Sequence, residues 1–238
     1  MAETIIKNLN ILVCDDDREI AGAIEIYLQS EGYTVFKAYD GIQALDTARR
    51  EVLHLIIMDI MMPNMDGIQA TMKIREEKNI PIIMLSAKSE DTDKIIGLNV
   101  GADDYITKPF NPLELIARVK SQLRRYTSLG SMPAGSGSGI YSSGGLVVDD
   151  NEKRVIVDGD EVAVTPIEFG ILKLLTENAG RVYSMEQIYE LVWQEPAYNP
   201  ENTVAVHVRR IREKIEIDPK NPRYLKVVWG IGYKIEKY

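Results

Sequence analysis

Residue types that are scarce in this sequence exclude several classes of protein. Its single cysteine, Cys14, cannot form an internal disulfide, which excludes a disulfide-stapled secreted domain. No apolar run approaches the ~20 residues that cross a bilayer. Residues 1–10 lack the basic-then-apolar pattern of a signal peptide. We therefore expect a cytoplasmic protein with no membrane association.

The residues that are present suffice for a globular protein. Apolar residues make up 45% and charged residues 27% of the 238 residues, enough for one large domain or two ordinary ones. The net charge of −8 argues against a surface covered with positive charge for nucleic acid. One short segment is nevertheless basic, with only Glu213 opposing Arg209, Arg210, Arg212 and Lys214. A local basic stripe of this kind is compatible with DNA binding.

The first half of the chain alternates apolar, β-rich runs with helical patterns. The runs expected to be strands are Ile11–Cys14, Thr34–Ala38, Leu55–Met58, Ile80–Leu85 and Tyr105–Thr107. Asp17 and Asn111 are placed to cap two of the helices, and the second of these runs to about Tyr126. This alternation predicts an α/β domain over residues 8–126 with a flavodoxin-like (βα)5 fold. Its site should lie at the carboxyl ends of the strands.

The chain changes character after residue 126. Residues 127–145 are rich in glycine and serine, which predicts a flexible linker rather than a long surface loop. Residues 146–238 are interpreted as an α+β domain with three helices and a final β-hairpin. Thr165, through a capping box with Glu168, and Ser184 each begin a helix. The strands expected before them are Leu146–Val148, Arg154–Val157 and Val162–Val164. The order of these elements predicts a winged helix-turn-helix domain.

Acidic residues follow two of the predicted strands. Asp15, Asp16 and Asp17 come directly after the first strand, and Asp59 ends the third. Because these strands are neighbours at the switch point of a doubly wound sheet, the carboxylates should converge on one pocket. Carboxylates so close repel one another unless a cation lies among them, and Mg²⁺ suits a few carboxylates with water and phosphoryl oxygens. Asp17 alone is better explained as a helix cap.

Two further polar residues end neighbouring strands. Ser86 follows the fourth strand and Lys108 the fifth, so both should reach the same rim. A lysine ammonium and a serine hydroxyl suit the oxygens of a phosphoryl group, and a carboxylate can accept that group as an aspartyl phosphate. Each residue alone would be unremarkable, whereas the combination at four strand ends predicts a phosphoryl-transfer site. Cys14 is interpreted as a core residue rather than a redox sensor.

The helix expected over residues 202–215 has an apolar and a basic face when it is turned at ~100° per residue. The residues expected to face the core are Val204, Val208, Ile211 and Ile215. The residues expected to point away are Thr203, Val206, Arg209, Arg210, Glu213 and Lys214, with Arg212 and His207 at the flanks. This distribution favours a helix in the DNA major groove, with Arg210 reading a base and Arg212 holding phosphate. A basic face that is merely solvated is the alternative.

The first half resembles the receiver domain of bacterial response regulators. The resemblance rests on ILVCDDD at residues 11–17, MDIMMP at 58–63, DG at 66–67, SA at 86–87 and KPF at 108–110. It implies Asp59 as phosphoacceptor, Ser86 and Lys108 as phosphoryl contacts, and Tyr105 as a switch residue. It also implies that Mg²⁺ is bound by Asp15, Asp16, Asp59 and the backbone carbonyl of Met61. A cis peptide bond is implied between Lys108 and Pro109.

The second half resembles the winged-helix domain of OmpR/PhoB-type regulators. The matching segments are TPIEF at residues 165–169, VHVRRIR at 206–212 and GIGY at 230–233. Many members carry an arginine just before the first wing glycine, which enters the minor groove, whereas this chain has Trp229. The wing is expected to use Trp229 for packing, or Lys226 and Lys234 as phosphate contacts. GADDYITKPF at 101–110 and WGIGYKIE at 229–236 are also similar to regulators of vancomycin resistance.

The resemblance implies a transcription factor rather than an enzyme. A sensor histidine kinase would phosphorylate Asp59, and the phosphorylated homodimer would bind promoter DNA, with RNA polymerase as a further partner. The family pairs its receivers through the fourth helix, the fifth strand and the fifth helix. The charged residues that this chain offers there are Lys94, Asp103, Asp104, Glu114, Arg118 and Lys120. We expect Lys94 to meet Glu114, and Asp104 to meet Arg118, across a two-fold axis.

Two other functions are left open by the residues themselves. A haloacid-dehalogenase-type phosphatase also uses an aspartate nucleophile with Mg²⁺. That class has a second aspartate two residues after the nucleophile, where this chain has Met61. A DNA-binding protein that acts without phosphorylation is the other alternative, and the intact acidic site argues against it.

Overall fold

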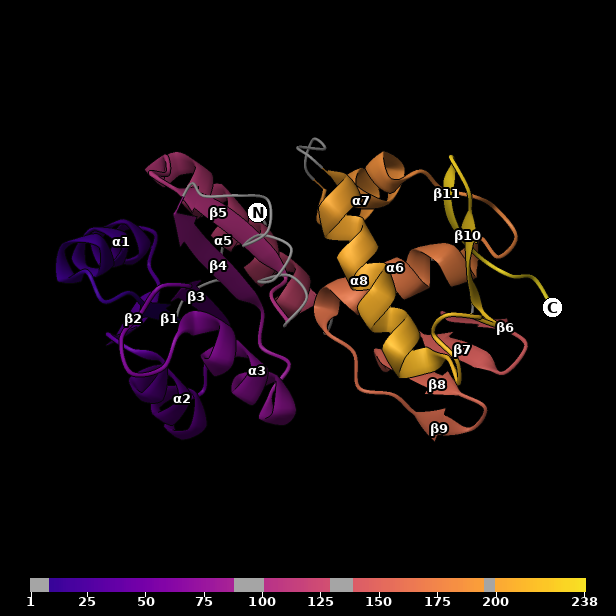
Figure 1. The fold of residues 1–238 in the computed structure, drawn as a ribbon, viewed down its shortest axis with the longest axis horizontal. Coiled ribbons are helices and arrows are strands. Elements are labelled where there is room, and N and C mark those ends of the chain that lie inside the picture. Colours follow the sequence, from indigo (N-terminus) through magenta and orange to yellow (C-terminus); the bar gives the residue numbers. More distant parts are fainter. Residues whose placement is uncertain (1–8, 88–100, 129–138, 195–199) are drawn as a thin grey trace. The chain divides into compact units, whose positions relative to one another are not determined.

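The chain forms two compact units, residues 1–126 and residues 127–238 (Figure 1). The computed structural model describes residues 9–87, 101–128, 139–194 and 200–238. None of the helices in these ranges is long and apolar enough to span a membrane.

The first unit is built on a five-stranded parallel sheet with the order β2-β1-β3-β4-β5. Its strands are β1 (Asn10–Cys14), β2 (Thr34–Ala38), β3 (Leu55–Asp59), β4 (Ile82–Ala87) and β5 (Asp104–Lys108). The central strands are buried along their length, as expected for a parallel sheet covered on both faces. The strand order confirms the predicted flavodoxin-like fold, and it places the ends of β1 and β3 side by side.

Helices cover both faces of this sheet (Figure 1). They are α1 (Arg18–Ser30), α2 (Gly41–Arg50), α3 (Gly67–Glu77) and α5 (Pro112–Ser128). The predicted caps are present, because the Asp17 carboxylate accepts hydrogen bonds from the first turn of α1 and Asn111 accepts one from Leu113 N. The fourth helix of the prediction, with Lys94, lies outside the described residues.

In residues 139–194 and 200–238, the second unit combines a four-stranded antiparallel sheet, three helices and a two-stranded hairpin. Its strands are β6 (Ile140–Ser143), β7 (Leu146–Asp149), β8 (Arg154–Val157), β9 (Asp160–Glu161), β10 (Leu225–Val228) and β11 (Gly232–Ile235). Its helices are α6 (Pro166–Glu177), α7 (Met185–Trp193) and α8 (Pro200–Ile215). Both predicted helix starts are confirmed as capping boxes, at Thr165 with Glu168 and at Ser184 with Gln187.

Several boundaries differ from the prediction, and the fourth strand, expected at Ile80–Leu85, is β4 at Ile82–Ala87. The segment expected to be linker, 127–145, begins inside α5 and ends with β6, and its residues 129–138 lie outside the described ranges. The strand expected at Val162–Val164 is wrong, because β8 pairs with β9 at Asp160–Glu161 instead. Val162 and Val164 pack against the core beside that pairing, which explains why they are apolar without being a strand.

Candidate functional site

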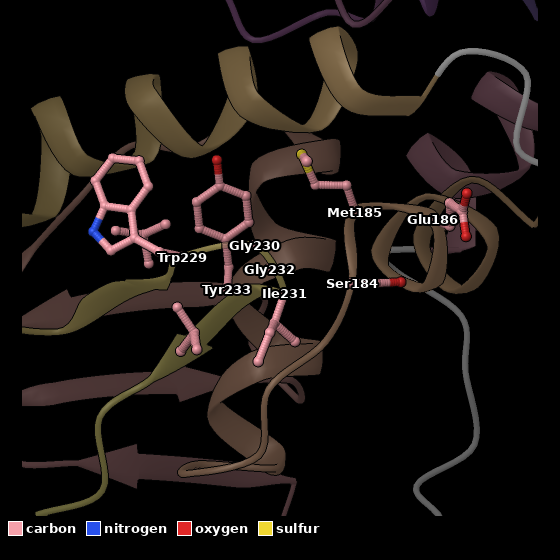
Figure 2. Close-up of a pocket in the computed structure, with 10 residues that line it drawn as sticks. Ser184, Met185, Glu186, Trp229, Gly230, Ile231, Gly232 and Tyr233 are labelled. Atoms are coloured by element: carbon pink, nitrogen blue, oxygen red, sulfur yellow. The ribbon is translucent and has the colours of Figure 1, made fainter.

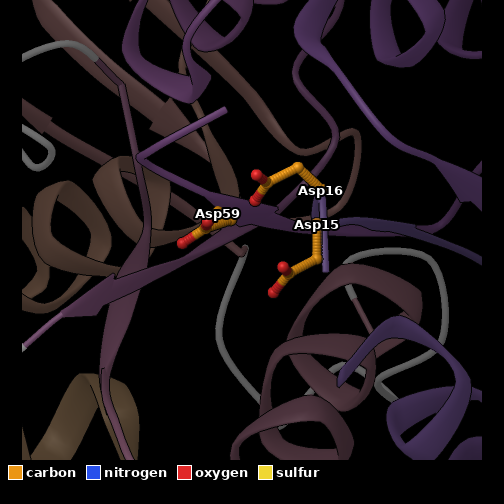
Figure 3. A group of neighbouring side chains, drawn as sticks. All are labelled: Asp15, Asp16 and Asp59. Carbon is orange, nitrogen blue, oxygen red and sulfur yellow. The ribbon is translucent and has the colours of Figure 1, made fainter. Parts of the chain in front are cut away.

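Three carboxylates meet where β1 and β3 end (Figure 3). Asp15 follows β1, Asp16 is the next residue, and Asp59 is the last residue of β3. One ligand oxygen from each lies within 4.8 Å of the others. Asp15 and Asp59 are buried, whereas Asp16 is exposed. The parallel pairing of β1 with β3 therefore gathers the acidic group that the sequence predicted.

Lys108 provides the positive charge of this site. Its ammonium nitrogen lies 2.6 Å from Asp15 Oδ2 and 3.1 Å from Asp59 Oδ1, because β5 delivers it to the same end of the sheet. The pKa of Asp59 is raised to about 6, because burial and, to a smaller extent, Asp15 and Asp16 raise it more than Lys108 lowers it. Burial alone would lower the pKa of Lys108, but its bonds to Asp15 and Asp59 raise that pKa above its usual value. The site therefore has more negative charge than Lys108 can offset.

The donor set suits a small divalent cation. Three carboxylates converge, and one of them is open to solvent, so water and a ligand oxygen could complete a coordination shell. Burial is the main cause of the raised pKa of Asp59, and the charges of Asp15 and Asp16 add to it. Among the residues that the structure describes, Asp15, Asp16 and Asp59 are the group placed to hold a metal ion.

The remaining residues predicted for this site lie around it in different ways. Ser86, at the end of β4, is buried, and its hydroxyl donates to the Ala87 carbonyl at 3.0 Å rather than into the pocket. Tyr105 is partly buried in β5, and Met61 is exposed beyond Asp59. The peptide bond between Lys108 and Pro109 is cis, as predicted.

The loop after Asp59 is held close to the sheet by a glycine. A Cβ atom on Gly67 would lie 1.9 Å from the Asp59 carbonyl oxygen, so only glycine fits where α3 begins. The Gly67 amide also donates to the Ile60 carbonyl at 3.0 Å. The start of α3 is therefore packed directly against the backbone of Asp59 and Ile60.

The basic helix α8 presents a second candidate surface. The four residues predicted to face the core are buried, namely Val204, Val208, Ile211 and Ile215. The predicted outer face is wrong at Thr203, Val206 and Arg210, which are buried, and His207, predicted at a flank, is buried as well. The helix packs against both α6 and α7, so its buried arc is wider than a single apolar stripe. His207, for example, lies with its ring 5.4 Å from that of Trp193 in α7.

Arg210 and Lys214 are held by a buried acid in α6. Arg210 is 8% exposed and lies 3.2 Å from Glu168, and the Lys214 ammonium lies 2.6 Å from the other oxygen of that carboxylate. Glu168 also accepts a hydrogen bond from Thr165 N at 2.8 Å as part of the capping box. Burial would raise the pKa of Glu168, but Arg210 and Lys214 lower it below its usual value. The expectation that Arg210 faces outward to read a base is thus corrected.

Two other arginines of α8 differ in their exposure. The Arg209 side chain is 68% exposed and forms an exposed pair with Glu213 at 3.0 Å. Arg212 is half-buried, donates to the Leu225 carbonyl of β10 at 3.0 Å, and lies 6.0 Å over the ring of Tyr233 in β11. Arg212 therefore joins α8 to the hairpin. Arg209 lies with Glu213 on the exposed side of α8, which we call the open strip.

The tip of the β10–β11 hairpin exposes a large aromatic side chain. Trp229 is 87% exposed, whereas the other tryptophan, Trp193, is buried and stacks on Tyr189. The expectation that Trp229 packs against the domain is therefore wrong. Figure 2 shows its indole on the same side of the hairpin as the Tyr233 ring, with Ile231 on the other side. Trp229 borders a pocket of about 440 Å³ between the hairpin and the start of α7.

Comparison with known proteins identifies both units. The model of the response regulator receiver domain matches residues 11–120, and the model of the transcriptional regulatory protein C-terminal domain matches residues 159–235. Regulatory protein VanR of Enterococcus faecium is 46% identical over 228 residues, covering 95% of this chain and 98% of that protein. The chain belongs to the OmpR/PhoB-type response regulators.

Other relatives of this response regulator extend over the whole chain as well. Regulatory protein VanRc of Enterococcus gallinarum is also 46% identical, over 95% of this chain and 98% of that protein. A solved structure of a RitR mutant is 26% identical, with a TM-score of 0.72, covering 97% of this chain and 100% of the other. The family is one of transcriptional regulators, which removes the phosphatase alternative.

Within the described residues, the charged side chains predicted for the dimer face of this response regulator form ion pairs inside the chain. Arg118 lies 3.0 Å from Asp104 and 3.1 Å from Glu114. Lys120 lies 2.7 Å from Glu31, on the side of α1. The Asp104–Arg118 pair, expected between two copies, forms here inside one copy. Lys120 pairs with Glu31 rather than with a residue of the predicted dimer face.

Asp103 is likewise not a surface charge of the regulator. It is buried and lies 2.6 Å from Arg75 in α3, and it accepts a hydrogen bond from Ile82 N at 2.9 Å. The sequence reasoning did not name Arg75, and it named Glu168 only as a capping-box residue and not as the partner of Arg210 and Lys214. An acidic residue inside the apolar run of α6 was the available signal for Glu168, because a buried carboxylate needs a basic partner.

Proposed function

We propose that this response regulator is phosphorylated on Asp59 by a sensor histidine kinase and then binds promoter DNA as a homodimer. The observation that carries the proposal is the position of Asp59, between Asp15, Asp16 and Lys108 at the end of β3. Asp59 is buried but lies at the carboxyl edge of the sheet, where ligands of such folds bind.

Each residue has a distinct part in the proposed transfer. An Asp59 carboxylate oxygen bonds to phosphorus as the bond from phosphorus to the donor imidazole breaks, and the imidazole leaves. Lys108 lies 3.1 Å from Asp59 Oδ1 and meets the charge of the incoming phosphoryl group. In this proposal the Ser86 hydroxyl rotates away from the Ala87 carbonyl and donates to the phosphoryl group. The side chain of Tyr105, in the neighbouring strand β5, then turns inward.

Asp15, Asp16, Asp59 and the carbonyl of Met61 are the proposed ligands of Mg²⁺. When bound, Mg²⁺ supplies positive charge that offsets the carboxylates and the phosphoryl oxygens. The meeting of three carboxylates with one ammonium supports this assignment, because the group carries more negative than positive charge.

The proposed output is a change in pairing between receivers. The face made by β5 and α5 carries Asp104, Glu114 and Arg118, and a two-fold axis would use each of them twice. Two paired regulators would then hold two DNA half-sites and present promoter DNA to RNA polymerase. On α8, the open residue Arg209 is proposed as the principal base contact in place of Arg210.

Intact-mass measurement after incubation with acetyl phosphate and Mg²⁺ tests the assignment. We expect one phosphoryl group on the wild-type protein and none on Asp59→Asn or on wild type with EDTA. Asp17→Asn is the matched control, because Asp17 caps α1 and an amide oxygen can replace its carboxylate there. Equal labelling of wild type and Asp59→Asn would reject Asp59 as the acceptor.

A further inference from the structure

The loop after Asp59 carries the backbone carbonyl that is proposed as a metal ligand. Residues 60–66 connect the end of β3 to the start of α3, and Met61 is the second of them. The near end of this loop is fixed to the sheet, because Ile60 N donates to the Leu85 carbonyl of β4 at 3.0 Å. The freedom of the Met61 carbonyl therefore depends on what holds the far end of the loop.

The far end of the loop is tied to the start of α2. Asn64 Nδ2 donates to Asp40 Oδ2 at 3.0 Å, and Asp40 is the N-cap of α2. The next residue, Gly41, donates its amide to the Met65 carbonyl at 2.9 Å. A Cβ atom on Gly41 would lie 2.6 Å from that same oxygen, so glycine is needed for so close an approach. Two successive residues at the start of α2 thus hold two successive residues of the loop.

Asp40 and Asn64 are both suited to this contact. Asn64 has a φ of +64°, in the left-handed region that asparagine adopts more readily than most other residues. The Asp40 carboxylate accepts from Gln43 N at 2.8 Å and from Gln43 Nε2 at 3.0 Å, which fixes its orientation. The Gln43 amide, and after it the Asn64 side chain, lower the pKa of Asp40 although burial opposes them. Asp40 is therefore an ionised acceptor, and hydrogen bonds to a charged acceptor are stronger than neutral ones.

We propose that Asp40 and Asn64 are positioning residues that keep the Met61 carbonyl within reach of a metal ion held by the three carboxylates. This inference rests on the proposed phosphorylation site, in which that carbonyl is a ligand. Asp40 and Asn64 act through the loop and not as ligands. Because Mg²⁺ demands near-ideal octahedral geometry, a carbonyl that can move away lowers the affinity of the site. Hydrogen bonds that orient ligands commonly contribute 10-fold or more to the affinity of a metal site.

Isothermal titration calorimetry of the unphosphorylated full-length protein with MgCl₂ tests the inference without any phosphoryl transfer. Asn64→Gly removes the hydrogen bond to Asp40, keeps the net charge and adopts the left-handed conformation without strain. We expect it to bind Mg²⁺ about tenfold more weakly than wild type. Asn10→Ala is the matched control, because the Asn10 amide donates to the Val52 carbonyl at 2.6 Å at the amino end of β1, away from the carboxylates. This control should bind Mg²⁺ as wild type does.

Exchanging the two side chains separates the hydrogen bond from charge and from loop flexibility. Asp40→Asn sets an amide donor against the Asn64 amide, and Asn64→Asp sets two carboxylates against each other. The double variant restores a donor and an acceptor with their places exchanged, and it keeps the wild-type net charge. Asparagine can still cap α2, and aspartate tolerates the left-handed region. The double variant should therefore bind Mg²⁺ about tenfold more tightly than the two single changes together predict.

Thermal unfolding first establishes that each variant is folded at the temperature of the titration. Equal Mg²⁺ affinity of wild type and Asn64→Gly, or additive changes in the exchanged pair, would overturn the inference and leave Mg²⁺-dependent labelling of Asp59 as proposed. An equal loss of affinity in Asn10→Ala would also overturn it, because any loosening of the receiver would then have the same effect. If the wild-type protein neither binds Mg²⁺ nor is labelled on Asp59, the proposed function fails, and this inference fails with it.

Discussion

At the scale of single residues, the acidic pocket balances attraction and repulsion at short range. Asp15 and Asp59 are buried with one ammonium between them, and Asp16 adds a third carboxylate at the rim. Burial and the neighbouring carboxylates outweigh Lys108 and leave the pKa of Asp59 at about 6. A site with this excess of negative charge is strained without a cation, and it is prepared to receive one.

The strain in the metal-free protein should depend on pH through Asp59. The folded-state pKa of Asp59 is above its unfolded value, so the folded protein binds this proton more tightly, and the contribution of Asp59 to stability is greatest at low pH. That contribution should fall as pH rises from about 4 to about 6, by at most ~3 kcal/mol at neutral pH because solvent screens part of the effect. Urea unfolding in EDTA across this range should show the loss for wild type. Asp59→Asn should lack it, and parallel pH profiles of the two proteins would contradict the prediction.

The pocket residues were predictable from the sequence because strand ends in a parallel sheet share one edge. That rule needs only the alternation of elements, and it placed Asp15, Asp59 and Lys108 correctly. It could not give the direction of a side chain at that edge, so the hydroxyl of Ser86 was not foreseen to bond to Ala87. Side chains further from the strand ends, such as Lys120, depended on neighbours that the sequence pattern does not show.

At the scale of elements, α8 shows where helical periodicity is sufficient and where it is not. The apolar positions at helical spacing, including Val208 and Ile211, were placed in the core as predicted. Charge alone could not place the basic ones, because a buried acid on another helix can bring a basic residue inward. Glu168 does this to Arg210, which the sequence assigned to the opposite face. The short strands β6 and β9 were missed since their residues carry little apolar alternation.

The two arginines in the middle of α8 should therefore behave differently. Arg210→Ala removes a buried partner of Glu168 and should destabilise the second unit by about 3 kcal/mol, as for other broken buried pairs. Arg209→Ala removes an exposed side chain, so stability should change little while discrimination at one base pair falls by about 1–3 kcal/mol. Urea unfolding and binding to a panel of single-site duplex variants would separate the two. Equal effects of both substitutions on unfolding would contradict the assignment.

At the scale of the whole molecule, the chain joins a receiver unit to a DNA-binding unit. The charged residues on β5 and α5 are paired within one copy, as Arg118 is with Asp104 and Glu114. Dimerisation on this face requires those pairs to be shared with or exchanged for a second copy. The charges on this face are thus paired within a single copy, which fits the proposal that the protein is monomeric until it is phosphorylated.

Charge reversal should test this face in the phosphorylated protein. Arg118→Glu places like charges beside Asp104 and Glu114, and a two-fold axis makes the effect count twice, so dimerisation should weaken about 2- to 30-fold. Adding Asp104→Arg should partly restore it. Sedimentation velocity measures both, with Arg49→Glu on α2 as the control, since Arg49 pairs with Glu77 away from this face. Undiminished dimerisation of phosphorylated Arg118→Glu would exclude the face.

The engagement of Arg210 and Lys214 with Glu168 also bears on how such a regulator can be retargeted. The residues that anchor α8 are separate from those on its open strip, such as Arg209 and Glu213. A gene duplicate could accumulate changes on that strip and recognise a new operator while its anchor stayed intact. A designer who wishes to rewire the circuit should accordingly randomise the strip and preserve the triad of Glu168, Arg210 and Lys214.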